Sequence, residues 1–216
     1  MRLLTLALAV AALPVAMSAQ TPAPAPAPTD ARTLGWQVRA DDPKADASKL
    51  SFVQMKPGWH ITTGPMSGVL FHPGMTGTGN FTAQTSVYFF PPKSTHQEAY
   101  GLVVGGKDLA GAGQSYTYFL ARNDGKFMIK RRDGDATSTI MAWTDTDAIT
   151  KWKQGDSPAL NVLRVEAGAK DVVFKINDAV VATRPRATTP VDGVVGLRAN
   201  HFLDLHVRDL TVTASK

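Results

Sequence analysis

The feature of this sequence that most constrains its fold is a succession of short apolar or alternating runs, with almost no helical periodicity after residue 33. Gly, Pro, Asn and Asp separate these runs at short intervals. Short β-rich runs divided by such turn residues are typical of an all-β sandwich or barrel. We therefore predict strands at Trp36–Asp41, Leu50–Lys56, Trp59–Thr62, Gly68–His72, Asn80–Phe90, His96–Gly105, Ser115–Arg122, Lys126–Arg132, Ser138–Thr144, Ala159–Ala167, Asp171–Ile176, Ala179–Thr183, Gly193–Ala199 and Phe202–Thr213.

Two hairpins are predicted from their turn residues. The Asp-Gly pair at 124–125 suits a two-residue turn, which requires positive φ. Pairing outward from that turn sets Tyr118 opposite Arg131, and a slip of one residue would exchange the two faces of the hairpin. The predicted core face carries Tyr116, Tyr118, Leu120, Phe127 and Ile129, and the other face carries Phe119, Met128, Lys130 and Arg132. A second hairpin is predicted at the Asn-Asp pair at 177–178.

The first 19 residues have the pattern of a secretory signal peptide, because Arg2 precedes an apolar run that ends in small residues. This run is shorter than the roughly 20 residues that a membrane-spanning helix needs. Residues 20–32 alternate Pro with Ala, a composition that favours extended polyproline II and builds no core. We predict a signal peptide over 1–19, a linker over 20–32 and one domain over 33–216, in a periplasmic or secreted protein without a membrane span after cleavage. The competing interpretations are an uncleaved membrane anchor for the first segment and a disordered tail left by processing for the second.

The charge and the cysteine content exclude several classes of function. The chain has no cysteine, so disulfides, thiol nucleophiles and cysteine-based zinc sites are excluded. The formal net charge is +5, and removal of the predicted signal peptide with Arg2 leaves +4. The cations are scattered, and residues 130–132 form the only run of three. Export and this dispersion predict that nucleic acid is not a partner.

Three stretches resemble a known fold family: YGLVVGG…YTYFLARNDGKFMIKRRDG from residue 100, NVLRVEAGAKDVVFKINDAVVAT from residue 161, and DGVVGLRANHFLDLHVRDLTV from residue 192. Together they resemble the concanavalin A-like lectin and glucanase jelly roll, nearest to the bacterial DUF1080 group, whose members are also called 3-keto-disaccharide hydrolase domains. The resemblance covers roughly residues 33–216. It implies a two-sheet antiparallel jelly-roll sandwich and a carbohydrate or glycoside ligand.

The sequence departs from the glycosidases of this fold at their acidic motif. Those enzymes carry an E-x-D-x-(x)-E strand, whereas Glu98 is followed by Tyr100, Leu102 and Val103. Retaining and inverting hydrolysis each need a pair of carboxylates. The Asn-Ser-Gly motif associated with many DUF1080 domains is also replaced, by Ala-Tyr-Gly-Leu-Val at 99–103.

His96, Glu98 and Tyr100 alternate along one predicted strand, so their side chains would share a face. An imidazole, a carboxylate and a phenol together can bind sugar hydroxyls or move protons. If the protein is an enzyme, we predict Glu98 and His96 as its catalytic residues. The competing interpretation is a hydrogen-bonded polar row on a solvated sheet face.

Further candidates for contact with a ligand lie elsewhere in the sequence. They follow a Pro-Gly turn, lie on the outward side of the first hairpin, or belong to a short loop between the last two strands, where binding groups often occur. The predicted substrate-binding residues are His60, Tyr100, Lys130, Arg132, Arg198, Asn200 and His201. The competing interpretation of Arg198, Asn200 and His201 is that they serve only to form the turn between the last two strands.

No histidine spacing predicts a specific metal site. Lectins of the resembled fold often hold calcium through Asp and Asn loops, so a divalent ion such as calcium stays open as a cofactor. Asp145 and Asp147 are the nearest approach to a paired-acid loop. We favour a turn there, with an N-cap before a short helical piece at 148–152.

These observations leave three hypotheses. The first is an exported domain that binds glycans without cleaving them. The second is a glycoside-cleaving enzyme of the 3-keto-disaccharide hydrolase type, in which one base removes a proton next to a ketone while Lys130 or Arg132 stabilises the oxyanion. The third is a structural or protein-binding sandwich.

Overall fold

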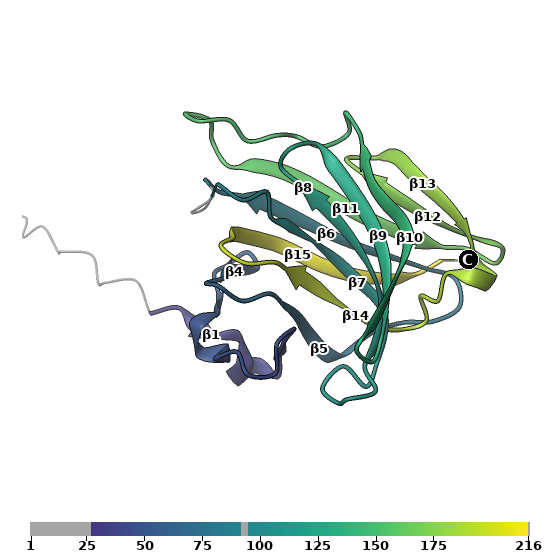
Figure 1. The fold of residues 1–216 in the computed structure, drawn as a ribbon, viewed down its shortest axis with the longest axis horizontal. Coiled ribbons are helices and arrows are strands. Elements are labelled where there is room, and N and C mark those ends of the chain that lie inside the picture. The colour runs from purple at the N-terminus through teal and green to yellow at the C-terminus, as the bar shows by residue number, and fades with distance from the viewer. Residues whose placement is uncertain (1–26, 92–94, 216) are drawn as a thin grey trace, which may run out of the picture.

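The computed structural model describes residues 27–91 and 95–215, and within them the chain forms two antiparallel β-sheets that pack face to face (Figure 1). The larger sheet has, in spatial order, β1 (Thr29–Asp30), β3 (Ser51–Gln54), β4 (Trp59–Thr62), β15 (Asp204–Ala214), β6 (Phe81–Phe89), β11 (Ala159–Ala167), β12 (Asp171–Ile176) and β13 (Ala179–Pro185). The smaller sheet has β10 (Ala136–Asp145), β9 (Lys126–Asp133), β8 (Ser115–Arg122), β7 (Ala99–Lys107), β14 (Gly193–Ala199), β5 (Gly68–Gly77) and β2 (Gln37–Ala40). The prediction of a two-sheet antiparallel sandwich is confirmed.

Helical structure in the described residues is limited to three short 3₁₀ helices: η1 (Ala31–Leu34), η2 (Ala47–Lys49) and η3 (Arg186–Thr188). The predicted helical piece at 148–152 is wrong, because the chain turns only at 147–148 and residues 150–152 have no regular structure. At the turn the Thr146 hydroxyl accepts a hydrogen bond from the Ala148 amide at 3.2 Å. None of the helices in the described ranges has the length and apolarity needed to cross a membrane.

The main hydrophobic core lies between the two sheets. Alternate residues of the smaller sheet, such as Leu102, Phe119 and Ile129, meet Phe81, Phe174 and other apolar side chains of the larger sheet. The Phe119 and Phe174 rings lie edge to face with centroids 5.2 Å apart, an arrangement that adds to the gain from burial. Core packing therefore fixes which residues of β7, β8 and β9 point away from the larger sheet.

The register of the β8–β9 hairpin differs by one residue from the predicted register. Arg122 pairs with Lys126, so the loop has three residues, and Gly125 adopts a left-handed φ of 91°. The predicted two-residue turn is therefore wrong. A three-residue loop also ends in a residue with left-handed φ, so the glycine alone does not distinguish the two turn types. As a result Phe119, Ala121, Phe127 and Ile129 lie in the core between the sheets, and Tyr116, Tyr118, Leu120, Met128, Lys130 and Arg132 lie on the opposite face.

The second predicted hairpin is confirmed. Ile176 pairs with Ala179, and the two turn residues have positive φ, 48° for Asn177 and 67° for Asp178. The Asn177 side chain also holds neighbouring segments, since its amide nitrogen donates to the Ala148 carbonyl at 2.8 Å and its oxygen accepts from the Val162 amide at 2.8 Å.

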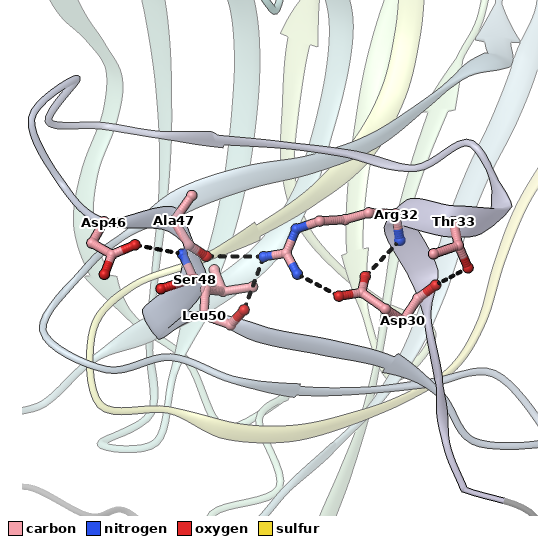
Figure 2. A network of polar contacts seen from close by, with 7 residues as sticks. All are labelled: Asp30, Arg32, Thr33, Asp46, Ala47, Ser48 and Leu50. Atoms are coloured by element: carbon pink, nitrogen blue, oxygen red, sulfur yellow. Dashed lines mark hydrogen bonds and ion pairs between the residues drawn. The ribbon is translucent and has the colours of Figure 1, made fainter.

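The N-terminal boundary of the sandwich lies earlier than predicted. Thr29 and Asp30 pair with β3, and Ala31 is completely buried, so the last residues of the predicted linker belong to the domain. Figure 2 shows why: the Arg32 guanidinium donates to the Asp30 carboxylate at 3.0 Å and to the carbonyls of Ala47 at 3.0 Å and Leu50 at 2.9 Å. The predicted signal peptide and the linker as far as residue 26 lie outside the described residues.

The connections at one end of the sandwich converge, and we call this end the loop end. It comprises residues 63–67, the described parts of 90–98, and residues 123–125, 146–158 and 200–203. Hydrogen bonds join these connections: the Thr63 hydroxyl donates to the Asn200 carbonyl at 2.6 Å, and the Asn123 side chain accepts from the Trp152 amide at 2.6 Å. Short polar loops on a rigid sandwich are a common place for binding groups.

Candidate functional site

The smaller sheet has an outward side, which we call the outer face, where side chains are buried although no second sheet covers them. Its apolar part comprises Val69, Phe71, Ala99, Val103, Leu109, Tyr116, Tyr118 and Leu120. The register shifts in β7, β14 and β10 mark irregularities of the kind that bend strands, and Figure 1 shows the strands around β9 and β10 curving along their length.

The polar centre of the outer face is the ion pair between Arg198 on β14 and Asp41, which follows β2. Two guanidinium nitrogens of Arg198 meet both oxygens of the carboxylate, one at 2.8 Å and the other as a shorter contact. Nη1 also donates to the Tyr116 hydroxyl at 3.4 Å, and Cζ lies 5.2 Å from the centroid of the Tyr118 ring. This bidentate contact with a cation–π contact fixes the guanidinium firmly on the sheet.

The electrostatics of this centre follow from burial and from the neighbouring cations. Burial alone would raise the pKa of Asp41, but the hydrogen bonds and charge of Arg198, with the charges of Arg132 and His201, bring that pKa below its usual value. Burial raises the pKa of Tyr116 and of Tyr118, against the opposing charge of Arg198. Asp41 is therefore anionic and both phenols are neutral hydrogen-bonding groups at neutral pH.

Two further cations lie on the outer face along β9. Lys130 pairs across the strands with Tyr118, and Arg132 pairs with Tyr116. Within the described residues neither cation has a carboxylate within ion-pair distance, unlike Arg198 or Arg122. The buried Nε of Arg132 also has no hydrogen-bond acceptor in that part of the chain. The predicted substrate-binding residues Lys130, Arg132 and Arg198 thus share one face.

At the loop end a second pair adjoins this face. The Glu98 carboxylate lies 2.7 Å from Nδ1 of His201, with the Glu98 side chain 12% exposed and the His201 side chain 45% exposed. Glu98 and His96 line a cavity of about 350 Å³ together with Phe89, Trp152 and Phe202. His201 lines a neighbouring hollow of about 240 Å³ beside Asp41. The Glu98–His201 pair therefore joins the cavity to the outer face.

Asn200 holds the backbone of this loop in place. Its amide donates to the Ala99 carbonyl at 3.0 Å, and its carbonyl accepts from the Thr63 hydroxyl at 2.6 Å. The side-chain oxygen of Asn200 is buried without a hydrogen-bond partner among the described residues. A role in the turn therefore accounts for the backbone hydrogen bonds of Asn200, but not for its side chain.

The predicted row of His96, Glu98 and Tyr100 on one strand face is wrong. β7 begins only at Ala99, so His96 and Glu98 belong to the connection before it. Tyr100 is 1% exposed in the core between the sheets, where its hydroxyl accepts a hydrogen bond from the Asn161 side chain at 3.0 Å and burial raises its pKa. Tyr100 is therefore a core residue that no ligand in solvent can contact.

His60 lies on the outward side of the larger sheet, so it does not join the other predicted ligand contacts. Its Nε2 is 2.8 Å from the Asp204 carboxylate, and its ring lies 6.3 Å from that of His206. Burial, with the charge of His60, lowers the pKa of His206 against a hydrogen bond to the Pro57 carbonyl. Trp59 packs against Trp36 at 4.8 Å between ring centroids, as expected for a core tryptophan.

No group of three or more His, Asp or Glu side chains in the described part of the chain is arranged to hold a metal ion. Asp145, one of the two acids of the predicted loop, instead forms an exposed ion pair with Lys126 at 2.6 Å.

Sequence reasoning missed Asp41, Tyr116 and Tyr118 as parts of the site. Asp41 lies in the acidic stretch ADDPKAD, which reads as a turn, and its partner Arg198 is 157 residues away. The two tyrosines alternate along β8. This alternation places them on one face of the strand, but it does not decide whether that face points into the core or outward. Only the register of β8 against β9 places them beside Lys130 and Arg132.

Comparison with known proteins finds likeness in structure alone. No family model matches the chain, and no curated protein matches its sequence. The carbohydrate-binding module CBM66 from Bacillus subtilis is 13% identical over 83% of this chain and 96% of its own, with a TM-score of 0.60. A family 16 glycoside hydrolase from Bacteroides ovatus, solved with a glucan product, is 9% identical over 82% and 94%, with a TM-score of 0.55.

A third similar structure is the carbohydrate recognition domain of Emp46p in its potassium-bound form, 12% identical over 87% of this chain and 93% of its own, with a TM-score of 0.51. Identities this low establish the fold and nothing finer. The chain is therefore a jelly-roll β-sandwich of the architecture found in lectins, carbohydrate-binding modules and family 16 glycoside hydrolases.

Proposed function

We propose that this protein is an exported carbohydrate-binding domain whose glycan lies on the outer face of the smaller sheet, next to the loop end. The observation that carries the proposal is the Arg198–Asp41–Tyr116 centre, a set of donors and acceptors held on strands beside a hollow of about 240 Å³. Binding sites for small ligands combine a concave surface with a few fixed polar groups of this kind.

Pre-organisation is what suits this centre to a polar ligand. The Arg198 side chain is 10% exposed and already bonded to Asp41, so it has little rotamer freedom left to lose when a ligand binds. Sugar hydroxyls both donate and accept hydrogen bonds, and here they would meet a guanidinium, a carboxylate and the His201 imidazole. The similar structures described as a carbohydrate-binding module and as a carbohydrate recognition domain support a sugar as the ligand.

Two sequence features support export to the periplasm or the medium. The N-terminal pattern is that of a secretory signal peptide, and the Pro-Ala stretch after it suits a spacer between a domain and its surroundings. The signal peptide lies outside the described residues, which include only residues 27–32 of the Pro-Ala stretch.

Affinity gel electrophoresis against a panel of soluble polysaccharides tests the proposal. Wild-type protein is expected to be retarded by at least one glycan, and His201→Gln is expected to weaken that retardation. His60→Gln is the matched control, because His60 forms a similar carboxylate pair on the opposite sheet. Equal effects of the two substitutions, or no retardation by any glycan, would contradict the proposed site.

A second function, cleavage of a glycosidic bond in 3-keto-glycosides, is favoured by the Glu98–His201 pair. A mostly buried carboxylate that orients an imidazole beside a cavity is an arrangement suited to general-base catalysis. Removal of a proton next to a ketone needs one base, whereas ordinary glycoside hydrolysis needs two carboxylates. In the described structure, the outward positions of β7 and β8 carry no carboxylate, which argues against the two-carboxylate mechanism.

Mass spectrometry of products separates the two functions. The purified protein would be incubated with plain and 3-keto disaccharides, with and without divalent ions. Release of a monosaccharide or keto-sugar that is lost in Glu98→Gln but kept in Asp204→Asn would establish the enzyme. Glycan binding without any product would support the carbohydrate-binding domain and contradict the enzyme.

A further inference from the structure

The cations of the outer face differ in whether they have a carboxylate partner. Four acids there or beside it are each paired with a cation or an imidazole: Asp41 with Arg198, Asp124 with Arg122, Asp145 with Lys126 and Glu98 with His201. Lys130 and Arg132 remain, side by side on β9, without a carboxylate partner among the described residues. β9 therefore presents two cations on the outer face without a carboxylate partner among the described residues.

The aromatic rings of this face are poorly placed to stack on a neutral sugar. Tyr116 is 1% and Tyr118 is 6% exposed, and the Arg198 guanidinium lies over the Tyr118 ring. The Arg122 guanidinium lies 4.3 Å from the centroid of the Trp143 ring and covers one side of it. What the face offers a ligand is therefore mainly cationic nitrogen rather than exposed aromatic surface.

Arg132 adds an independent observation. Its Nε is buried and has no acceptor in the described part of the chain, and the same is true of the Nε of Arg198. A buried donor without a partner is energetically costly, so such groups are uncommon in folded proteins unless they serve a purpose. Guanidinium groups match carboxylate and sulfate oxygens in geometry, with two parallel N–H···O bonds.

From these observations we infer that the ligand of the outer face is an anionic glycan, whose carboxylate or sulfate group is held by Lys130 and Arg132. The inference rests on the proposed function and makes it more specific. The Arg198–Asp41 centre would contact the hydroxyls of the same or the adjoining sugar residue, because Arg132 pairs across the strands with Tyr116, whose hydroxyl accepts a hydrogen bond from Arg198.

Polygalacturonate and its fully methyl-esterified form test this directly, since they share a sugar backbone and differ in charge. Titration calorimetry with the whole protein is expected to show binding of polygalacturonate and at least tenfold weaker binding of the ester. Dextran sulfate and dextran form the second pair of probes. Binding of polygalacturonate assigns the anion as a carboxylate, and binding of dextran sulfate alone assigns it as a sulfate.

The variants locate the effect on β9. Lys130→Gln with Arg132→Gln is expected to weaken binding of the anionic probe at least tenfold, whereas the charge-preserving pair Lys130→Arg with Arg132→Lys retains most of the binding and guards against a folding defect. The control Lys170→Gln with Arg208→Gln removes the same charge from exposed positions outside the face and is expected to change little.

Two results would overturn the inference in distinguishable ways. Equal binding of the acid and its ester, or equal losses in the β9 and control variants, would remove the anionic glycan and leave the proposed function intact. Failure to bind any charged or neutral glycan would remove both.

Discussion

Glu98 and His201 form a carboxylate–imidazole contact of 2.7 Å that joins the loop end of the sandwich to its outer face. The two residues are 103 positions apart in the sequence, and they meet because the connections before β7 and after β14 lie side by side. A similar contact of 2.8 Å between His60 and Asp204 lies on the opposite sheet. Substitutions of His60 or Asp204 can therefore serve as controls for substitutions of Glu98 or His201.

Glu98→Gln is expected to weaken glycan binding by threefold to tenfold and to change stability by less than about 1 kcal/mol, because the His201 partner is 45% exposed and exposed ion pairs contribute little. Calorimetric titration and urea unfolding measure the two effects. Asp204→Asn is expected to leave the affinity unchanged. A large loss of stability without a change in affinity would make the Glu98–His201 pair structural.

The ion pair of Asp41 with Arg198 predicts a specific pH dependence of stability. The pKa of Asp41 in the folded state is below the value of about 3.9 for an unfolded chain, so its carboxylate stabilises the fold above that pH and ceases to do so as the pH falls through the folded pKa. Asp41→Asn is therefore expected to lower the free energy of unfolding by about 1–3 kcal/mol at pH 7.

Urea unfolding at pH 7 and near pH 3 checks this prediction, and the difference between wild type and Asp41→Asn should shrink at the lower pH. Asp171→Asn, at an exposed strand end, serves as the control. A difference that stays constant across this range would show that the ion pair does not stabilise the fold.

The core network around Asn161 predicts a graded loss of stability. Its side chain donates to the Tyr100 hydroxyl at 3.0 Å and to the Thr150 carbonyl at 2.9 Å, and accepts from the Thr150 amide at 2.8 Å and from the Asn177 side chain at 2.9 Å. Asn161→Ala is expected to cost about 3 kcal/mol, since it leaves several buried groups unpaired.

Tyr100→Phe is expected to cost only about 1 kcal/mol, because Asn161 keeps its contact with Thr150. Thermal unfolding of both variants measures the two losses. Tyr100→Phe should also leave glycan binding unchanged, in contrast to the sequence-based prediction that Tyr100 contacts the ligand. Weaker binding by a fully folded Tyr100→Phe variant would reinstate that prediction.

The strands were predictable from the sequence because their alternation and turn residues are local signals. Ser115–Arg122, Ala159–Ala167, Asp171–Ile176 and Gly193–Ala199 have the predicted bounds. The two faces of β7 and β8 were not predictable, since nearly all residues in both strands are buried and alternation carries no information there. One extra residue in the turn before Lys126 then exchanged the faces of β8, whereas Met128, Lys130 and Arg132 of β9 lie on the outward side as predicted.

The site was predictable only in part, for the same physical reason. Arg198, Lys130, Arg132 and His201 were identified because polar residues in strands and short loops stand out locally. Asp41 was missed, because its role depends on a partner 157 residues away. His60 resembles His201 in its surroundings, and only the sheet order places the two histidines on opposite faces.

The most direct test of the central claim is a two-dimensional NMR titration of the ¹⁵N-labelled protein with the glycan that binds best. The account predicts that amide signals of β8, β9 and β14 and of residues 200–203 shift together, while those of His60 and His206 on the larger sheet stay in place. Shifts centred on the larger sheet, or none on the smaller, would contradict a binding site built on the Arg198–Asp41 centre.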